Sequence, residues 1–418
     1  MQHMGKWFIS SVLLLLIFGC SNTQPVDVDI SQWRGPARDG IYPDTGLLKE
    51  WPEGGPEMLW AFEGLGAGHG SPVIAGEFVY VTGIPDTISS GGFLYKLDLK
   101  GNLIWKKSYG PDFTENFPGA RSTPMVAGDL IYVESGAGAV YCLNANTGDE
   151  VWSVNFFRDL AADSVQFGYS ESVLIDGDRV IFTPGGKINN MVALNRFTGE
   201  KIWGSPAYGE QATYSSPILV NHNGNRLVVN LTASSIIGLD ADTGEMYWRF
   251  FQFQDNKIHA NTPIYHDGKV LICSASRRDS SGLVLLQLSP DGKEAEILWR
   301  NKEIINLMGG LILKDGYIYG PGYLQNRWYC IDWNTGETRY VNRDFGGGPV
   351  IWADGLFYCY AEREGEMALV EANPEAFRVI SKFTVDKGTA EHWAHPVIGK
   401  GMLLVRHGDA LMSYRIRS

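Results

Sequence analysis

The chain has 418 residues, of which 47 are acidic and 35 basic, and its formal net charge is -12. No run of lysine and arginine could follow a phosphate backbone, so we expect no nucleic-acid partner. Hydrophobic residues make up 44% of the chain and glycines number 50. Because residues 31–418 contain no linker-like stretch, this composition favours one large all-β domain.

The first thirty residues are predicted to carry the chain to a membrane. Lys6 precedes an apolar run over residues 7–18 that is too short to span a bilayer, and Gly19 stands directly before Cys20. This pattern resembles the lipobox of bacterial lipoproteins, which implies cleavage before Cys20 and lipid on that residue. The alternative is a plain signal peptide that happens to contain a cysteine. We expect a signal peptide over 1–19, a tether over 20–30, and a body outside the cytoplasm.

From residue 71 onward a strand-forming pattern recurs eight times, at intervals of roughly 38 to 52 residues. Each unit begins with a small residue that is usually followed by proline, as at Ser71-Pro72. Its best copies end in Thr-Gly-x-x-x-Trp, at residues 147–152, 198–203 and 243–248. A unit of this length that ends on a turn dipeptide and a large aromatic residue is typical of one blade of a β-propeller.

The last unit, residues 396–416, has only three strand-like runs and no terminal tryptophan. Residues 57–62 form an orphan strand that carries Trp60 and lies before the first complete unit. If this strand completes the final sheet, the ring closes by pairing the two ends of the chain and leaves no open edge between blades. The prediction is therefore an eight-bladed β-propeller of four-stranded antiparallel blades over residues 31–418.

The regular spacing of the tryptophans from the turns predicts that they pack between neighbouring blades, with each indole N–H donating to a carbonyl. A role as stacking platforms for a sugar or cofactor is the alternative. The residues predicted to dock blades are Trp60, Trp105, Trp152, Trp203 and Trp248.

The repeated Leu-Asn/Asp-x-x-Thr-Gly-x-x-x-Trp motif resembles the PQQ-type propeller repeat. That family includes quinoprotein alcohol dehydrogenases and non-enzymatic BamB-like lipoproteins of the bacterial envelope. Residues 31–40 (SQWRGPARDG) look like an N-terminal segment common in PQQ-like repeat proteins of bacterial envelopes. The resemblance implies the fold, whereas the motif builds blades in enzymes and scaffolds alike.

Quinoprotein dehydrogenases typically carry a disulfide between adjacent cysteines, a calcium site made by Glu and Asn, and a catalytic Asp. No two cysteines are adjacent here, and no Asp/Asn/Glu spacing indicates a calcium site. We predict no catalytic residue, metal or cofactor; PQQ with calcium is expected only if the chain is such an enzyme. The repeat places Cys142, Cys273, Cys330 and Cys359 mostly in distant blades, which favours buried free thiols, although a Cys330–Cys359 disulfide stays open.

In propellers, the loops that lead into the innermost strands surround one end of the central channel. These loops predict a candidate ligand pocket that could bind an anionic or metal-bound ligand. The alternative is that such loops are polar simply because they face water. The candidate residues are His69, Arg121, Tyr169, Glu171, Tyr214, His259, Asn261, His392, Trp393 and His395.

The sequence therefore favours a membrane-tethered propeller lipoprotein that acts as a non-enzymatic binding or scaffold protein of the bacterial envelope, as in the BamB-like members of the family. We expect a lipid-anchored monomer at the periplasmic face of the outer membrane, with an envelope protein or a small molecule as its partner. The alternative is a PQQ-dependent alcohol or sugar dehydrogenase.

Overall fold

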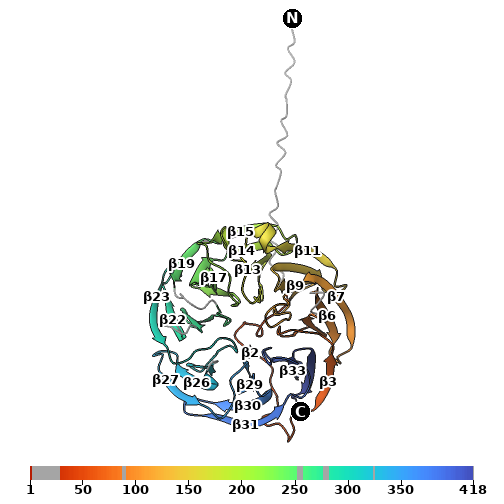
Figure 1. The fold of residues 1–418 in the computed structure, drawn as a ribbon. Coiled ribbons are helices and arrows are strands. Elements are labelled where there is room, and N and C mark those ends of the chain that lie inside the picture. Colours follow the sequence, from red (N-terminus) through yellow and green to blue (C-terminus); the bar gives the residue numbers. More distant parts are fainter. Residues whose placement is uncertain (2–28, 87–90, 252–257, 276–281, 323–324, 418) are drawn as a thin grey trace.

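A computed structural model describes residue 1 and residues 29–86, 91–251, 258–275, 282–322 and 325–417. Its strands form eight sheets arranged radially around a central axis (Figure 1). Each blade has four antiparallel strands of its own, and two blades gain one further short strand. The predicted all-β, eight-bladed propeller is confirmed. Cys20, with most of the candidate signal peptide and tether, lies outside the described residues.

Blades 1 to 7 each use four consecutive strands. In blades 1 and 2 these are β4–β7 and β8–β11, with the bounds Val73–Ala75, Phe78–Gly83, Gly91–Asp98, Leu103–Pro111, Met125–Ala127, Leu130–Ser135, Ala139–Asn144 and Glu150–Asn155. In blades 3 and 4 these are β12–β15 and β16–β19, with the bounds Leu174–Asp176, Arg179–Phe182, Asn189–Asn195, Lys201–Pro206, Ile218–His222, Asn225–Leu231, Ser235–Asp240 and Met246–Phe251. In blades 5 and 6 these are β20–β23 and β24–β27, with the bounds Ile264–His266, Lys269–Ser274, Gly282–Leu288, Ala295–Asn301, Ile312–Lys314, Tyr317–Gly322, Arg327–Asp332 and Thr338–Asn342. Blade 7 contains β28–β31, with the bounds Val350–Ala353, Leu356–Tyr360, Glu366–Ala372 and Phe377–Thr384.

Blade 8 joins the two ends of the chain. It contains β32 (Val397–Gly399), β33 (Met402–His407) and β34 (Ala410–Arg415), and its outermost strand is β3 (Met58–Glu63). β3 pairs antiparallel with β34, with Trp60 opposite Ser413. The predicted ring closure by residues 57–62 is thus confirmed.

The antiparallel order of each blade gives the ring two different faces. The Thr-Gly turns and the hairpins between the first two strands of each blade lie on one face, which we call the turn face. The loops that lead into the innermost strands lie on the opposite face, which we call the mouth face. Strands alternate in direction, so each blade contributes to both faces in the same way.

On the turn face, a blade-end tryptophan reaches the next blade along the ring. Each indole N–H lies 2.9–3.2 Å from a backbone carbonyl oxygen of that blade. The pairs are Trp60 with Leu99, Trp105 with Asn146, Trp152 with Arg196, Trp203 with Ala241, Trp248 with Gly292 and Trp299 with Trp333.

The glycine of the Thr-Gly turn serves this packing as well as the turn. Gly244 has φ +74°, a conformation that other residues rarely adopt, and a Cβ there would lie 2.5 Å from Cε3 of Trp203. Gly101, Gly199 and Gly336 face Trp60, Trp152 and Trp299 in the same way. The repeat motif therefore encodes a turn and the surface on which the neighbouring tryptophan packs.

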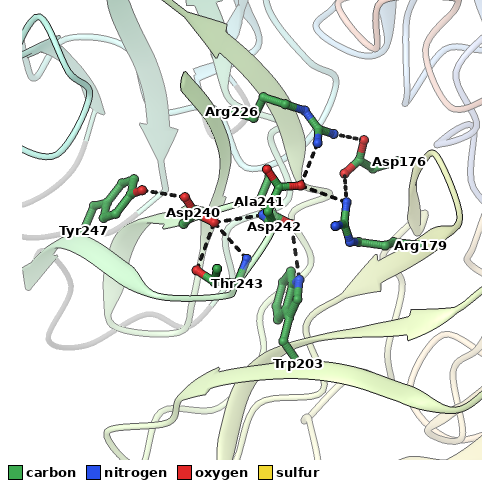
Figure 2. A network of polar contacts seen from close by, with 9 residues as sticks. All are labelled: Asp176, Arg179, Trp203, Arg226, Asp240, Ala241, Asp242, Thr243 and Tyr247. Carbon is green, nitrogen blue, oxygen red and sulfur yellow. Dashed lines mark hydrogen bonds and ion pairs between the residues drawn. The ribbon is translucent and has the colours of Figure 1, made fainter. Parts of the chain in front are cut away.

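Figure 2 shows how charge reinforces the contact between blades 3 and 4 on this face. The buried carboxylate of Asp176 in β12 accepts from Arg226 in β17 and from Arg179 in β13. Both arginines also pair with Asp242, at 2.7 and 3.0 Å. Each arginine thus has two carboxylate partners, so the charges are locally compensated.

The chain's first described strands cross the centre of the ring (Figure 1). β1 (Ile30–Ser31) pairs antiparallel with β8 in blade 2, and β2 (Ile41–Tyr42) pairs parallel with β28 in blade 7. We call residues 30–42 the channel segment. Three of its side chains donate to three other blades: Trp33 to Thr262 at 3.0 Å, Arg34 to the Leu311 carbonyl at 2.7 Å and Arg38 to the Val173 carbonyl at 3.0 Å. The segment therefore lies inside the channel and ties five blades together.

A short helix, α1 (Phe156–Leu160), follows blade 2, and the Asn155 side chain caps it by accepting from the backbone N–H groups of Phe157 and Arg158. Within the described residues, no helix is both long and apolar enough to cross a membrane. Cys142, Cys273, Cys330 and Cys359 are all buried free thiols, as favoured from the repeat.

Candidate ligand site at the channel mouth

A cavity of about 270 Å³ opens at the mouth face, above the channel segment. Loops leading into the innermost strands of blades 1 to 6 and 8 contribute to its wall, and Trp33 joins them from the channel segment. The described residues that line it are Trp33, His69, Phe117, Arg121, Thr123, Phe167, Ser170, Ser172, Tyr214, Ser216, Ile258, Ala260, Leu307, Met308, Gly309, Trp393 and His395.

Aromatic rings in mutual contact make up much of this wall. The ring centroids of Trp393 and His69 lie 4.9 Å apart, and those of Trp393 and Phe117 lie 5.3 Å apart. Phe167 continues the wall, 6.4 Å from Phe117 and 6.3 Å from Tyr214. These separations and tilted geometries are typical of attractive aromatic pairs. The cavity is thus more apolar than the polar pocket expected from the sequence.

Arg121 places a guanidinium group in this apolar wall. Its Nη2 donates to the Asn116 carbonyl at 2.9 Å and to the Phe117 carbonyl, and the group lies 5.1 Å from the centroid of the Phe113 ring. Its buried Nε has no hydrogen-bond partner among the described residues, and no ion pair between described residues includes Arg121. Burial lowers the pKa of Arg121, while the nearby Asp112 raises it.

The two histidines of the wall are neutral at physiological pH. Burial, and then the charges of Arg121 and Arg406, lower the pKa of His69 to about 3. Burial, and then the charge of Arg34, hold the pKa of His395 well below its usual range. Among the described lining residues, Arg121 is therefore the only one that carries a full charge.

The structure brings five of the ten predicted residues to the cavity: His69, Arg121, Tyr214, Trp393 and His395. Each of them stands three residues, or one, before the Pro that lies near the start of a unit. The other five stand two or four residues before the corresponding Pro or Val and are absent from the described lining: Tyr169, Glu171, His259, Asn261 and His392. Because side chains of an extended segment alternate, this period of two separates the two groups.

The residues that face away have partners elsewhere. The hydroxyl of Tyr169 lies 2.8 Å from the Asp163 carbonyl oxygen, and the Asn261 side chain donates to the Asn306 carbonyl at 2.7 Å. His259 is fully buried, and its backbone N–H donates to the Thr213 hydroxyl. The His392 ring stacks on His407, with centroids 3.7 Å apart.

Glu171 belongs to a buried pair of carboxyl groups rather than to the cavity. Its backbone N–H donates to Glu134 at 2.8 Å, and its own side chain accepts from Asn230 at 3.4 Å. Burial raises the pKa of Glu171 to about 8, although the charge of Arg38 opposes this shift. Burial and the neighbouring Glu171 raise the pKa of Glu134 well above its usual range.

Sequence reasoning missed several lining residues that the same register identifies. Ser170 stands three residues before Val173, and Ala260 stands three residues before Pro263, and both line the cavity. Phe117 and Phe167 were missed for another reason, since they lie deeper in the two long loops before blades 2 and 3. Nothing in their local sequence indicates that those loops fold back over the mouth.

The donor groups of the cavity do not fit a calcium-bound quinone cofactor. Ca²⁺ takes six to eight oxygen ligands, usually including carboxylates, and none of the described lining residues has a carboxylate. Within the part of the chain that the structure describes, no group of three or more His, Cys, Asp or Glu side chains could hold a metal ion.

The eight blades, the Thr-Gly turns and the docked tryptophans define a PQQ-type β-propeller. The family model described as outer membrane protein assembly factor BamB matches residues 90–342, and the chain belongs to this family.

Two curated relatives match shorter parts of the chain. BamB of Burkholderia pseudomallei (strain K96243) is 28% identical over 157 residues, which are 37% of this chain and 35% of that protein. The quinoprotein ethanol dehydrogenase of Pseudomonas aeruginosa is 27% identical over 156 residues, which are 34% of this chain and 24% of that enzyme. The match thus spans about a third or less of each relative's length.

Two solved structures show the same fold over most of the chain. BamB from Moraxella catarrhalis has a TM-score of 0.62 at 14% identity, covering 86% of this chain and 97% of that one. The quinohemoprotein alcohol dehydrogenase from Comamonas testosteroni has a TM-score of 0.62 at 12% identity, covering 91% of this chain and 79% of that one. At these identities the likeness establishes the fold alone.

Proposed function

We propose that the chain is a non-enzymatic binding protein of the bacterial envelope, and that its mouth cavity receives part of an envelope protein. Family membership supports this proposal, since the Burkholderia relative is described as an assembly factor for outer membrane proteins. The observation that carries it is the composition of the cavity. Aromatic and apolar side chains surround one guanidinium, with no carboxylate among the described lining residues, and such a surface suits binding better than acid–base catalysis.

Site-specific photo-crosslinking in cells tests this proposal. A crosslinking residue in place of Phe117, which is 49% exposed at the cavity, is expected to capture an envelope protein involved in outer membrane assembly. The matched control is Val341, which is 39% exposed on the outer strand β27. If Phe117 and Val341 give the same products, or if Phe117 gives none, the mouth is not the binding surface.

We also propose that the protein is a monomer anchored by lipid on Cys20 to the periplasmic face of the outer membrane, after removal of residues 1–19. Residues 20–30 then act as the tether for a single domain over 31–418. Labelling cells with radioactive palmitate is expected to mark the wild type, and Cys20→Ser is expected to lose both the label and membrane attachment. Retention of label in Cys20→Ser excludes this anchor.

The match to a quinoprotein ethanol dehydrogenase favours one other function, a PQQ-dependent oxidoreductase. The lack of a carboxylate among the lining residues that the structure describes argues against it. Adding PQQ and Ca²⁺ to the purified protein distinguishes the two functions, because an enzyme of this class is expected to gain a quinone absorbance and to reduce a dye with alcohols or sugars. Neither change is expected here.

A further inference from the structure

The mouth cavity has room for one ring-sized group. Pockets that hold drug-sized ligands usually enclose about 300–1,000 Å³, and this cavity encloses about 270 Å³. Its ligand is therefore small, or is one side chain of a larger molecule.

The wall favours a flat aromatic body. Trp393, Phe117 and Phe167 present ring faces and edges to the cavity, and Phe117 is about half exposed although it is large and apolar. An aromatic ligand can add tilted or offset contacts to these rings, each worth about 0.5–1.5 kcal/mol beyond the area that it buries.

Arg121 adds a requirement for negative charge. Asp112 and Glu391 lie near enough to raise its pKa, but no ion pair between described residues joins either to Arg121. The Asp112 oxygens accept from the Tyr109 hydroxyl and from the backbone N–H groups of Phe113 and Gly136. The guanidinium thus keeps a buried Nε–H without an acceptor in a wall of low polarity. A ligand carboxylate can pair with the guanidinium and compensate its charge, because carboxylates match the planar donor edge of arginine.

The same arrangement discriminates against other ligands. The charge of Arg121 repels the ammonium groups that aromatic cages otherwise bind. The two wall histidines are neutral, so the described lining offers one cation and matches one anionic group.

From the ring wall and the single guanidinium, we propose that the cavity binds an aromatic monocarboxylate, with the ring against Phe117, Phe167 and Trp393 and the carboxylate on Arg121. This rests on the proposed binding function of the mouth and specifies its ligand. A free aromatic acid and the C-terminal aromatic residue of a peptide share this chemistry.

Calorimetric titration of the full chain provides the test. 3-Phenylpropionate is expected to bind at least about tenfold more tightly than its neutral amide, 3-phenylpropanamide, because only the acid can pair with Arg121. Arg121→Gln is expected to remove this preference, whereas Arg121→Lys keeps part of it. The control is Arg378→Gln on the exposed face of β31, which leaves both affinities unchanged. Because the proposed ligand ring packs against Trp393, Trp393→Ala is expected to weaken the binding of the acid and of the amide by the same factor.

A second arm identifies the source of the carboxylate. A short peptide that ends in Phe with a free carboxylate is compared with the same peptide as a C-terminal amide. Tighter binding of the free-carboxylate peptide than of phenylpropionate identifies a chain terminus, and the reverse identifies a small acid.

Three outcomes overturn the proposal. The acid and the amide bind with equal affinity, the preference for the acid survives in Arg121→Gln, or neither acid source binds at about 10 mM. Melting temperatures of all variants establish that they are folded. If the titration shows no binding but Phe117 crosslinks to an envelope protein, the aromatic acid is rejected and the proposed binding function stands. If neither binding nor crosslinks are seen, the ligand and the proposed function are both rejected.

Discussion

The two faces of the ring use tryptophan in opposite ways. Trp203 on the turn face is 6% exposed, packs against Gly244 and donates its indole N–H to the Ala241 carbonyl. Trp393 on the mouth face lines a cavity and contacts the rings of His69 and Phe117. The first belongs to a repeated motif, whereas the second lies in a loop whose sequence differs from blade to blade.

Polar groups show the same contrast. On the turn face, Arg179 and Arg226 each have two carboxylate partners (Figure 2). On the mouth face, Arg121 has no ion-pair partner among the described residues, and its Nε is buried without an acceptor. We infer that the charges in Figure 2 are compensated within the protein, whereas the charge of Arg121 is left for a ligand.

Removing one tryptophan from each face gives the largest expected difference. Trp203→Ala is expected to lower the free energy of unfolding by about 3–5 kcal/mol, because it leaves a cavity between blades 3 and 4. Trp393→Ala is expected to cost about 0.5 kcal/mol, since its ring borders an existing cavity. Urea unfolding of both variants measures the difference. Similar losses in the two variants would contradict the division of roles between the faces.

Two glycines of the turn face separate strain from packing. Gly244→Ala introduces a Cβ against Trp203 at φ +74°, and we expect a loss of about 2–4 kcal/mol. Gly224 has a similar φ of +86° but open space around it, so Gly224→Ala is expected to lose only about 1 kcal/mol. Thermal unfolding compares the two. Equal losses would show that the tryptophan contact adds nothing to the turn.

Substitutions in the Asp–Arg network of Figure 2 test whether these paired charges stabilise the turn face. The Asp176 side chain is 6% exposed, and Asp176→Asn is expected to lower the free energy of unfolding by about 1–2 kcal/mol by weakening its bonds to Arg179 and Arg226. Asp242 is 48% exposed, so Asp242→Asn is expected to lose about 0.5 kcal/mol or less. Denaturant unfolding in low salt measures both, and a larger loss in Asp242→Asn would reverse this ranking.

The smallest expected effect is a change in pH dependence. Burial raises the pKa of Glu171 from 4.5 to about 8, so the folded state holds this proton more tightly than the unfolded state does. The resulting stability is complete below pH 4.5 and is lost as the pH rises towards 8. Glu171→Gln is expected to reduce this loss by on the order of 1 kcal/mol in melting experiments across that range. Exposed Glu200→Gln is the control, and an unchanged pH profile in Glu171→Gln would show that the Glu134–Glu171 pair does not couple to folding.

The sequence predicts the blades well because their signals are local. Thr198 and Gly199 mark a turn, Trp203 follows at a fixed distance, and each copy repeats the pattern. The position of the channel segment had no such signal. Arg34 donates to the carbonyl of Leu311, 277 positions away, and every residue has a carbonyl that could accept.

The mouth was predictable in position but not in orientation. Ser170 and Ser172 line the cavity, while Glu171 between them joins Glu134 inside the blades. A prediction based on polarity selected Glu171, whereas one based on the two-residue period of the extended segment selects its neighbours. The carboxyl group is also buried beside that of Glu134, and burial raises the pKa of both groups, which composition does not predict.

Closure through β3 has a consequence for biosynthesis. Residues 58–63 are translated before strands β4–β33, yet β34, their partner in the sheet, is translated only after those strands. Contacts of such long range form slowly, because most of the chain must first be in place. Seven blades can assemble as the chain emerges, while the amino-terminal strands wait without a partner. We therefore expect ring closure to follow the assembly of the other blades, and truncation within β34 to leave the early strands exposed to aggregation and proteolysis.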